Sequence, residues 1–320
     1  MENRRGLSHS FIDALKSHAG LGLSRFVDAI KQDQTLDLEI RNDYINIYYR
    51  GGNLIKLEEN RDKYIASFDR KYILTPTNTR LPIKIGNQVL EGYPDVSAWI
   101  DAIPDIKLEM DHWFSVHPKN EREFQQLIVR ENNFSRTAKG TDYFICDIEY
   151  SSVHGRFDLI AANWPSSSAR RKDNQNVGLA FIEMKYMDNA MRGESGILPH
   201  IRDMVDYYSD SRNKDNFASL KQEMCTVFKQ KFELGLIDNQ KPIERFNDKI
   251  PAFILIFANH DPDSEILDRE LDSIQGVAAT SPFTIKIAVS NFMGYGLYEQ
   301  NIFGLEEFRS RYSKQIYAKQ

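Results

Sequence analysis

Three strand-like runs follow one another in the middle of the chain, with no helical pattern between them. They span residues 141–152, 155–164 and 178–189, and the short joint between the first two suits a hairpin. A helix pattern at 118–132 precedes them. Two helix patterns, at 197–210 and 217–236, and a fully apolar run at 251–259 come after them. Consecutive strands indicate antiparallel pairing, whereas a helix between two strands indicates a parallel crossover. This order predicts an α/β fold with a mixed sheet and helices on both faces.

The first third of the sequence has a different pattern. Two short amphipathic helices are predicted at 8–18 and 22–33, and the period-two alternation of a strand hairpin follows over 36–59. We therefore expect residues 1–110 to form an additional α+β module, with a recognition or regulatory role. Residues 111–320 are expected to form the domain that carries the mixed sheet.

Net charge and cysteine content limit the kinds of partner and the cellular compartment that fit this protein. The formal net charge is −5, which excludes a generally basic surface, so any nucleic-acid contact must come from local patches or from metal ions. Cys146 and Cys225 lie far apart and fit no metal-site spacing, which indicates free thiols in a reducing compartment. No run reaches the roughly 18 apolar residues of a membrane helix, and the first residues contain no signal core. These features favour a cytoplasmic protein with no membrane partner.

The third strand-like run is interrupted by two charged residues. Glu183 and Lys185 alternate with Met184, so they lie on one face of the strand, where they would be costly to bury without a partner charge, a metal ion or access to solvent. Asp158 interrupts the preceding strand in the same way, and the two carboxylates can converge if the strands are neighbours. Oxygen ligands without cysteine favour Mg²⁺ or Mn²⁺, with the Met184 backbone carbonyl as a further ligand. The alternative to a metal site is a simple ion pair between Glu183 and Lys185 on a solvated strand face.

Asp158, followed 25 residues later by Glu183-Met184-Lys185, resembles the motif of the PD-(D/E)xK nuclease superfamily. The resemblance covers roughly residues 118–260 and implies a restriction-endonuclease-like core of helix, three-stranded meander, helix and strand. It implies that Asp158 and Glu183 are metal ligands and that Lys185 is the catalytic lysine. Many members add a glutamate from the first core helix, for which Glu123 is the best match. Glu123 also has capping-box spacing from Asn120, which is sufficient reason for a glutamate there.

Two further groups are candidates for the site. Exonuclease-like members often carry Gln-x-x-x-Tyr on the second core helix, where this chain has Asp203-x-x-x-Tyr207, with His200 on the same side of the helix. These side chains could face the site or form a polar flank of the helix. A loop between the strands of Asp158 and Glu183 carries a cluster of three cations that could meet nucleic-acid phosphates or be solvated, namely Arg170, Arg171 and Lys172.

The combined prediction is a metal-dependent nuclease that hydrolyses phosphodiester bonds, with DNA favoured over RNA as the substrate. A homodimer would supply two sites for cutting two strands. One alternative is a catalytically silent nucleic-acid-binding or assembly module on the same fold. Another is a defence or toxin effector nuclease that a ligand activates through the N-terminal module.

Overall fold

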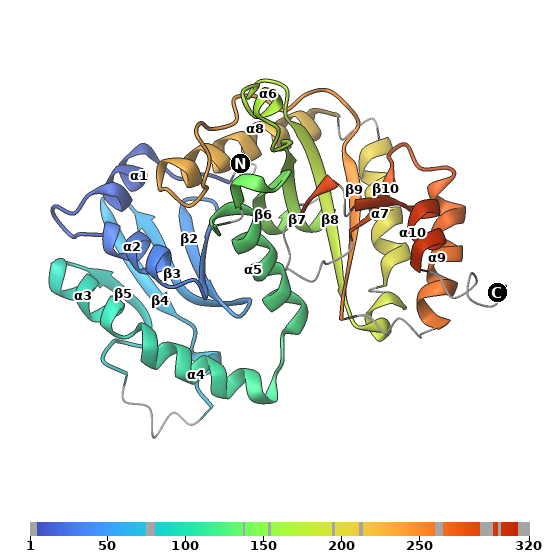
Figure 1. Ribbon diagram of the computed structural model, residues 1–320. Helices are drawn as coiled ribbons and strands as arrows, with labels where there is room; N and C mark the ends of the chain where they lie inside the picture. Colours follow the sequence, from blue (N-terminus) through green and yellow to red (C-terminus); the bar gives the residue numbers. More distant parts are fainter. Residues whose placement is uncertain are drawn as a thin grey trace. The chain divides into compact units, whose positions relative to one another are not determined.

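The computed structural model describes nine stretches of the chain, which are residues 5–74, 81–136, 138–152, 155–193, 196–210, 214–259, 265–288, 297–299 and 302–312 (Figure 1). The chain divides into two compact units. The first comprises Met1–Gln126 with Thr226–Ile237, and the second comprises Leu127–Cys225 with Asp238–Gln320. The division therefore falls later than the boundary expected at residue 110, and a distant segment joins the first unit.

The first unit contains one antiparallel sheet with the strands in sequence order. The strands are β1 (Leu36–Ile40), β2 (Tyr44–Tyr49), β3 (Gly52–Asn60), β4 (Lys63–Phe68) and β5 (Gly86–Leu90). The β2–β3 hairpin turns at Arg50 and Gly51, which both have left-handed backbone conformations with φ of 49° and 71°. Two successive positive φ angles define a type I′ turn, whose twist matches that of the flanking strands.

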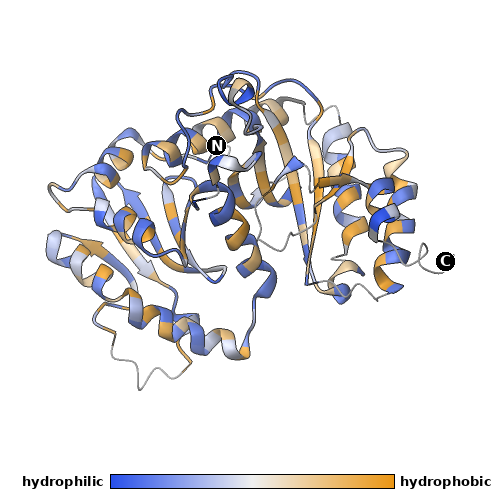
Figure 2. Cartoon of the chain, viewed as in Figure 1, coloured by the Kyte–Doolittle hydropathy of each residue, from blue (hydrophilic) through white to orange (hydrophobic). Residues whose placement is uncertain are grey.

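Amphipathic helices accompany this sheet, and Figure 2 shows hydrophilic and hydrophobic residues alternating around them. They are α1 (His9–Lys16), α2 (Ser24–Gln32), α3 (Tyr93–Asp101) and α4 (Ile103–Val116), with a 3-10 turn η1 (Arg70–Tyr72). Helix α1 begins after Ser8, whose side chain accepts a hydrogen bond from the Phe11 backbone N–H, and it buries Phe11, Ile12 and Leu15. The apolar stripe read from the sequence is therefore the face that packs.

The second unit contains a six-stranded mixed sheet in the order β11-β10-β9-β8-β7-β6. Its strands are β6 (Tyr143–Ser152), β7 (Gly155–Asn163), β8 (Gly178–Tyr186), β9 (Ala252–Ala258), β10 (Ile285–Ala288) and β11 (Ile302–Gly304). Strands β6, β7 and β8 form an antiparallel meander, while β9 pairs in parallel with both β8 and β10. The predicted α/β class with a mixed sheet is confirmed.

Two longer helices are α5 (Asn120–Asn133) and α8 (Lys214–Glu233), and the division between the compact units falls within each of them. The remaining helical segments are η2 (Ala138–Gly140), α6 (Ser168–Arg171), η3 (Asp188–Met191), α7 (Ile197–Ser209), α9 (Glu265–Ala278) and α10 (Leu305–Tyr312). Helix α7 packs against β7 and β8 and lies beside α9. Among the helices of the described stretches, none has both the length and the hydropathy needed to cross a bilayer.

Candidate active site

The candidate site lies where β7 and β8 stop pairing. The last pair in their antiparallel register is Leu159 with Ile182, so Asp158 and Glu183 occupy the next position on each strand. The backbone of Asp158 is no longer paired with β8. Its side-chain Oδ2 instead accepts a hydrogen bond of 3.0 Å from the Met184 backbone N–H. The structure thus brings Asp158 alongside the segment that holds Glu183 and Lys185.

Glu183 and Lys185 are both buried and form an ion pair with each other. The exposed fraction of their side chains is 4% and 5%, and Lys185 Nζ lies 2.7 Å from Glu183 Oε1. They share a face of β8 because side chains alternate along a strand. Strand β9 pairs with β8 through both positions, so the edge of β8 that faces β9 is covered there, while β7 no longer pairs with the opposite edge. The pair gives each charge the partner that burial demands.

His200 of α7 contacts the same carboxylate. Its Nε2 lies 3.3 Å from Glu183 Oε1, and its side chain is about one-quarter exposed at 26%. Burial, together with the nearby positive charge of Lys185, lowers the pKa of His200, while Asp158 and Asp203 act in the opposite direction. The imidazole therefore shares an electrostatic environment with all three residues of the predicted motif.

The donor set of this site suits a hard divalent cation. Carboxylates of Asp158 and Glu183 and the backbone carbonyl of Met184 are oxygen donors on adjacent strands, and Mg²⁺ is commonly held by one or two carboxylates with water completing its shell. No cluster of three or more His, Cys, Asp or Glu side chains with metal-site geometry occurs within the described stretches. The site thus offers two carboxylates rather than a closed protein cage.

Glu123 is held in another place. It belongs to the first compact unit, where its carboxylate accepts hydrogen bonds of 3.2 and 3.3 Å from Arg50 Nε and Nη2. Arg50 also donates to Asp111 at 2.8 Å, and these bonds raise the pKa of Arg50. In this structure the Glu123 carboxylate is engaged by a cation in its own unit.

Tyr207 and Asp203 differ in their surroundings although they share a helix. Tyr207 is buried, with its ring centroid 5.4 Å from that of Phe157 in an edge-on arrangement. Burial and the nearby charge of Glu223 raise the pKa of Tyr207 to about 12, so its phenol stays protonated at neutral pH. Asp203 is exposed on the helix surface. Tyr207 therefore belongs to the packing behind β7, and Asp203 contributes to the site through its charge near His200.

The cationic loop lies at the other end of β7. Arg171 is fixed there, since its guanidinium donates to the Thr141 carbonyl at 2.5 Å and lies over the Phe144 ring at 4.6 Å. Burial lowers the pKa of Arg171 to about 10. Arg170 and Lys172 are exposed. The structure does not bring this cluster to Asp158, and Arg171 fastens the loop to the sheet instead of offering its charge to a ligand.

Sequence reasoning missed the Arg50–Glu123–Asp111 network, because its members are far apart in the chain and no local pattern links them. Sequence reasoning also missed Arg156, whose positive charge helps to lower the pKa of His200. Its position on β7, two residues before Asp158 and on the same face of the strand, was a usable signal. No protein-family model matches this chain, and neither the curated proteins nor the solved structures include a significantly similar one.

Proposed function

We propose that the second compact unit is a metal-dependent nuclease that hydrolyses nucleic-acid phosphodiester bonds, with DNA favoured over RNA as the substrate. The order of its elements supports a restriction-endonuclease-like core. A three-stranded antiparallel meander is followed by helix α7 and then by β9, which is parallel to β8, and the C-terminal part of α5 precedes the meander. This is the arrangement that the resemblance to the PD-(D/E)xK superfamily implies.

One observation carries the proposal. The Asp158 carboxylate is bonded to the Met184 backbone N–H, at the position where Glu183 and Lys185 lie buried on one face of the neighbouring strand. Buried charged groups that lie beside a specific charge partner are candidates for a functional site, and half-buried Asp158 lies next to this pair. The three groups that the superfamily uses for hydrolysis are thus adjacent in space as well as in motif order.

Each residue has a role in this proposal. Asp158, Glu183 and the Met184 carbonyl would hold Mg²⁺ or Mn²⁺, which when bound polarises phosphoryl oxygens and lowers the pKa of a bound water. The Lys185 ammonium would orient the attacking water and neutralise negative charge that develops on the phosphoryl oxygens. His200 would hold the Glu183 carboxylate in place through Nε2.

The test is cleavage of supercoiled plasmid, single-stranded DNA and RNA, with Mg²⁺ or Mn²⁺ and with EDTA. We expect cutting that requires the metal and falls by at least about 100-fold in Asp158→Asn and Glu183→Gln. Glu58→Gln is the matched control, because Glu58 also pairs with a lysine two residues away on a strand, Lys56 of β3. Metal-dependent cutting that persists in both site variants would refute the assignment.

A catalytically silent nucleic-acid-binding or assembly module is the second candidate. The observation in its favour is that Lys185 already neutralises Glu183, so an ion pair alone accounts for both buried charges. Calorimetric titration with Mn²⁺ separates the two functions. Binding that weakens in Glu183→Gln supports the nuclease, and the absence of binding in wild type supports the silent module.

A further inference from the structure

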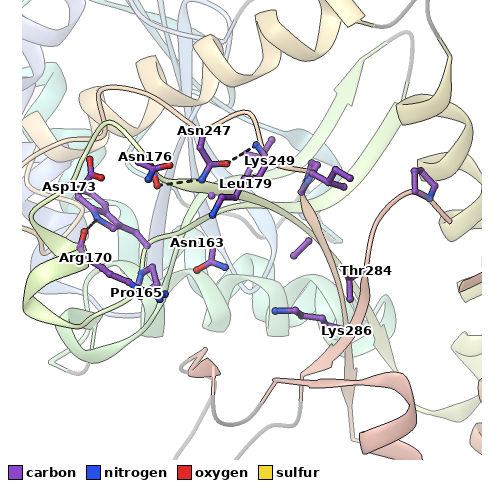
Figure 3. Close-up of a pocket in the computed structure, with 16 residues that line it drawn as sticks. Asn163, Pro165, Arg170, Asp173, Asn176, Leu179, Asn247, Lys249, Thr284 and Lys286 are labelled. Atoms are coloured by element: carbon purple, nitrogen blue, oxygen red, sulfur yellow. Dashed lines mark hydrogen bonds between the residues drawn. The ribbon is translucent and has the colours of Figure 1, made fainter.

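A pocket in the second compact unit lies at the opposite end of the sheet from Asp158 and Glu183. Its volume is about 520 Å³, and it is bounded by the end of β7 and the starts of β8, β9 and β10 (Figure 3). Leu179 of its lining precedes Glu183 by four residues on β8, which is about 13 Å at roughly 3.3 Å per residue. The pocket is therefore a separate site from the candidate active site.

Positive charge dominates this pocket. Its lining contains three cations, Arg170, Lys249 and Lys286, and a single carboxylate, Asp173, which leaves a formal charge of +2 in a chain whose net charge is −5. Within the described residues, neither the Arg170 guanidinium nor the Lys249 ammonium has an ion-pair partner, whereas Lys286 lies 3.5 Å from Glu299. Arginine and lysine side chains that line one pocket without an ion-pair partner favour an anionic ligand.

The pocket also presents an unused acceptor. Asn163 donates through Nδ2 to the Tyr143 hydroxyl at 3.2 Å and to Glu299 at 3.3 Å. Its Oδ1 is buried and accepts no hydrogen bond from any residue that the structure describes. Figure 3 shows Asn163 in the pocket with Lys286 extending towards it from β10. A buried acceptor without a donor is costly, and a turn of the Asn163 amide towards the pocket would let a ligand N–H or O–H satisfy it.

Size and wall chemistry define the ligand further. Pockets of roughly 300–1,000 Å³ hold small molecules and cofactors, and the volume here falls in that range. Ile250, Pro251 and Leu179 supply apolar walls, while the amides of Asn176 and Asn247 supply polar groups beside them. Cations, apolar walls and amides together match a ligand with a phosphate group and a flat heterocycle.

We propose that this pocket binds a nucleotide through its phosphate group. Lys249, Lys286 and Arg170 contact the phosphate, and Asn163 Oδ1 accepts a hydrogen bond from the base or the sugar. The ligand chemistry is a phosphomonoester on a nucleoside, which a free nucleotide and a 5′-phosphorylated nucleic-acid end both supply. The inference stands on the pocket alone and does not require the nuclease function.

The experiment is calorimetric titration of the full chain with nucleoside 5′-monophosphates and, separately, inorganic phosphate. We expect mononucleotides to bind more tightly than phosphate, and Lys249→Ala and Lys286→Ala to weaken nucleotide binding by about tenfold or more each, because each removes a charge-assisted hydrogen bond. Lys63→Ala is the matched control, since it removes an exposed lysine from β4 of the first unit. Asn163→Leu should also weaken binding, and the lysine variants decide the question if it fails to fold.

A second arm identifies the source of the phosphate. Short oligonucleotides with a 5′-phosphate are compared with the same sequences carrying a 5′-hydroxyl. Tighter binding of the phosphorylated strands indicates a nucleic-acid end, and binding of mononucleotides alone indicates a free nucleotide; both support the pocket. Binding that is unchanged in the two lysine variants, binding that Glu183→Gln abolishes, or no binding at millimolar nucleotide would overturn it.

Discussion

At the scale of single residues, strand β8 of the second unit carries two buried charged side chains. Glu183 and Lys185 neutralise each other in a nearly fully buried position, and His200 adds a third polar contact. The sequence indicated that these charges needed relief, and the pattern of Asp158 with Glu183 and Lys185 indicated where they would meet. The sequence left an ion pair open only for a solvated strand face, whereas the structure buries the pair, because burial depends on packing that the pattern does not contain.

The ion pair between Glu183 and Lys185 predicts that substitutions at the two residues have non-additive effects on the free energy of unfolding. Glu183→Gln and Lys185→Met each leave one buried charge without its partner, so we expect each to lower the free energy of unfolding by about 3 to 5 kcal/mol. The double variant should lose clearly less than the sum, as measured by urea unfolding. Lys56→Met and Glu58→Gln form the control pair on β3, whose side chains are 35% and 28% exposed and should couple by less than about 1 kcal/mol. Additive losses at Glu183 and Lys185 would argue against the pairing.

Asp37 predicts a pH dependence of stability. Burial raises the pKa of this carboxyl above its usual 3.8, despite the opposing charges of Lys231 and Arg41. An acid with a raised pKa binds its proton more tightly in the folded chain, so its favourable contribution is present at low pH and lost as pH rises through the raised pKa. Asp37→Asn should therefore raise the melting temperature near neutral pH, with a gain that shrinks towards about pH 4. The exposed Asp13→Asn should show no such trend, and an equal gain at every pH would contradict the assignment.

At the scale of elements, local patterns carried most of the fold. The meander strands, the apolar β9 and helix α7 lie where period and composition placed them, because their apolar runs, and Ile201 and Met204 of the helix, are buried in the core. The cationic loop is different. Arg171 belongs to a cationic cluster of the kind that binds phosphates. Its guanidinium nevertheless lies over the Phe144 ring and donates a hydrogen bond to a backbone carbonyl. Only the tertiary structure separates these two uses of an arginine.

Helix α8 supplies a structural lysine to the first unit. Lys231 Nζ lies 2.7 Å from Glu39 Oε1 of β1, and both side chains are almost fully buried. Lys231→Met should lower the free energy of unfolding by about 3 to 5 kcal/mol, because it removes the nearer of two cations from a buried carboxylate and leaves Arg41, at 3.6 Å, beside it. Lys229→Met, two residues earlier and 61% exposed, should change it by less than about 1 kcal/mol. Equal effects of the two substitutions in denaturant titration would show that the contact contributes little.

At the scale of the whole molecule, the division into units was the least predictable feature. Segment Thr226–Ile237 joins the first unit although about a hundred residues separate it from Gln126. Its contacts include the Gln230 side chain, which accepts from the Leu7 backbone N–H at 3.0 Å and donates to the Leu7 carbonyl at 2.8 Å. A single sequence contains no signal for such a long-range return.

This organisation predicts the behaviour of fragments. Residues 1–126 expressed alone lack the segment that pairs Lys231 with Glu39, so we expect a poorly folded fragment with a low melting temperature. Joining residues 226–237 to it through a flexible linker should restore cooperative unfolding, followed by circular dichroism. The same fusion carrying Lys231→Met serves as the control and should remain less stable. An isolated 1–126 fragment that melts cooperatively without the segment would contradict the division.

The proposed metal-dependent nuclease site of Asp158, Glu183 and Lys185 can be decided by one comparison of cleavage rates. The initial rate of Mg²⁺-dependent plasmid cleavage would be measured for wild type, Lys185→Ala and Lys56→Ala, with folding of each checked by circular dichroism. We expect Lys185→Ala to lose at least about 100-fold in rate and Lys56→Ala to cut like wild type. A folded Lys185→Ala protein that cuts at the wild-type rate would contradict it.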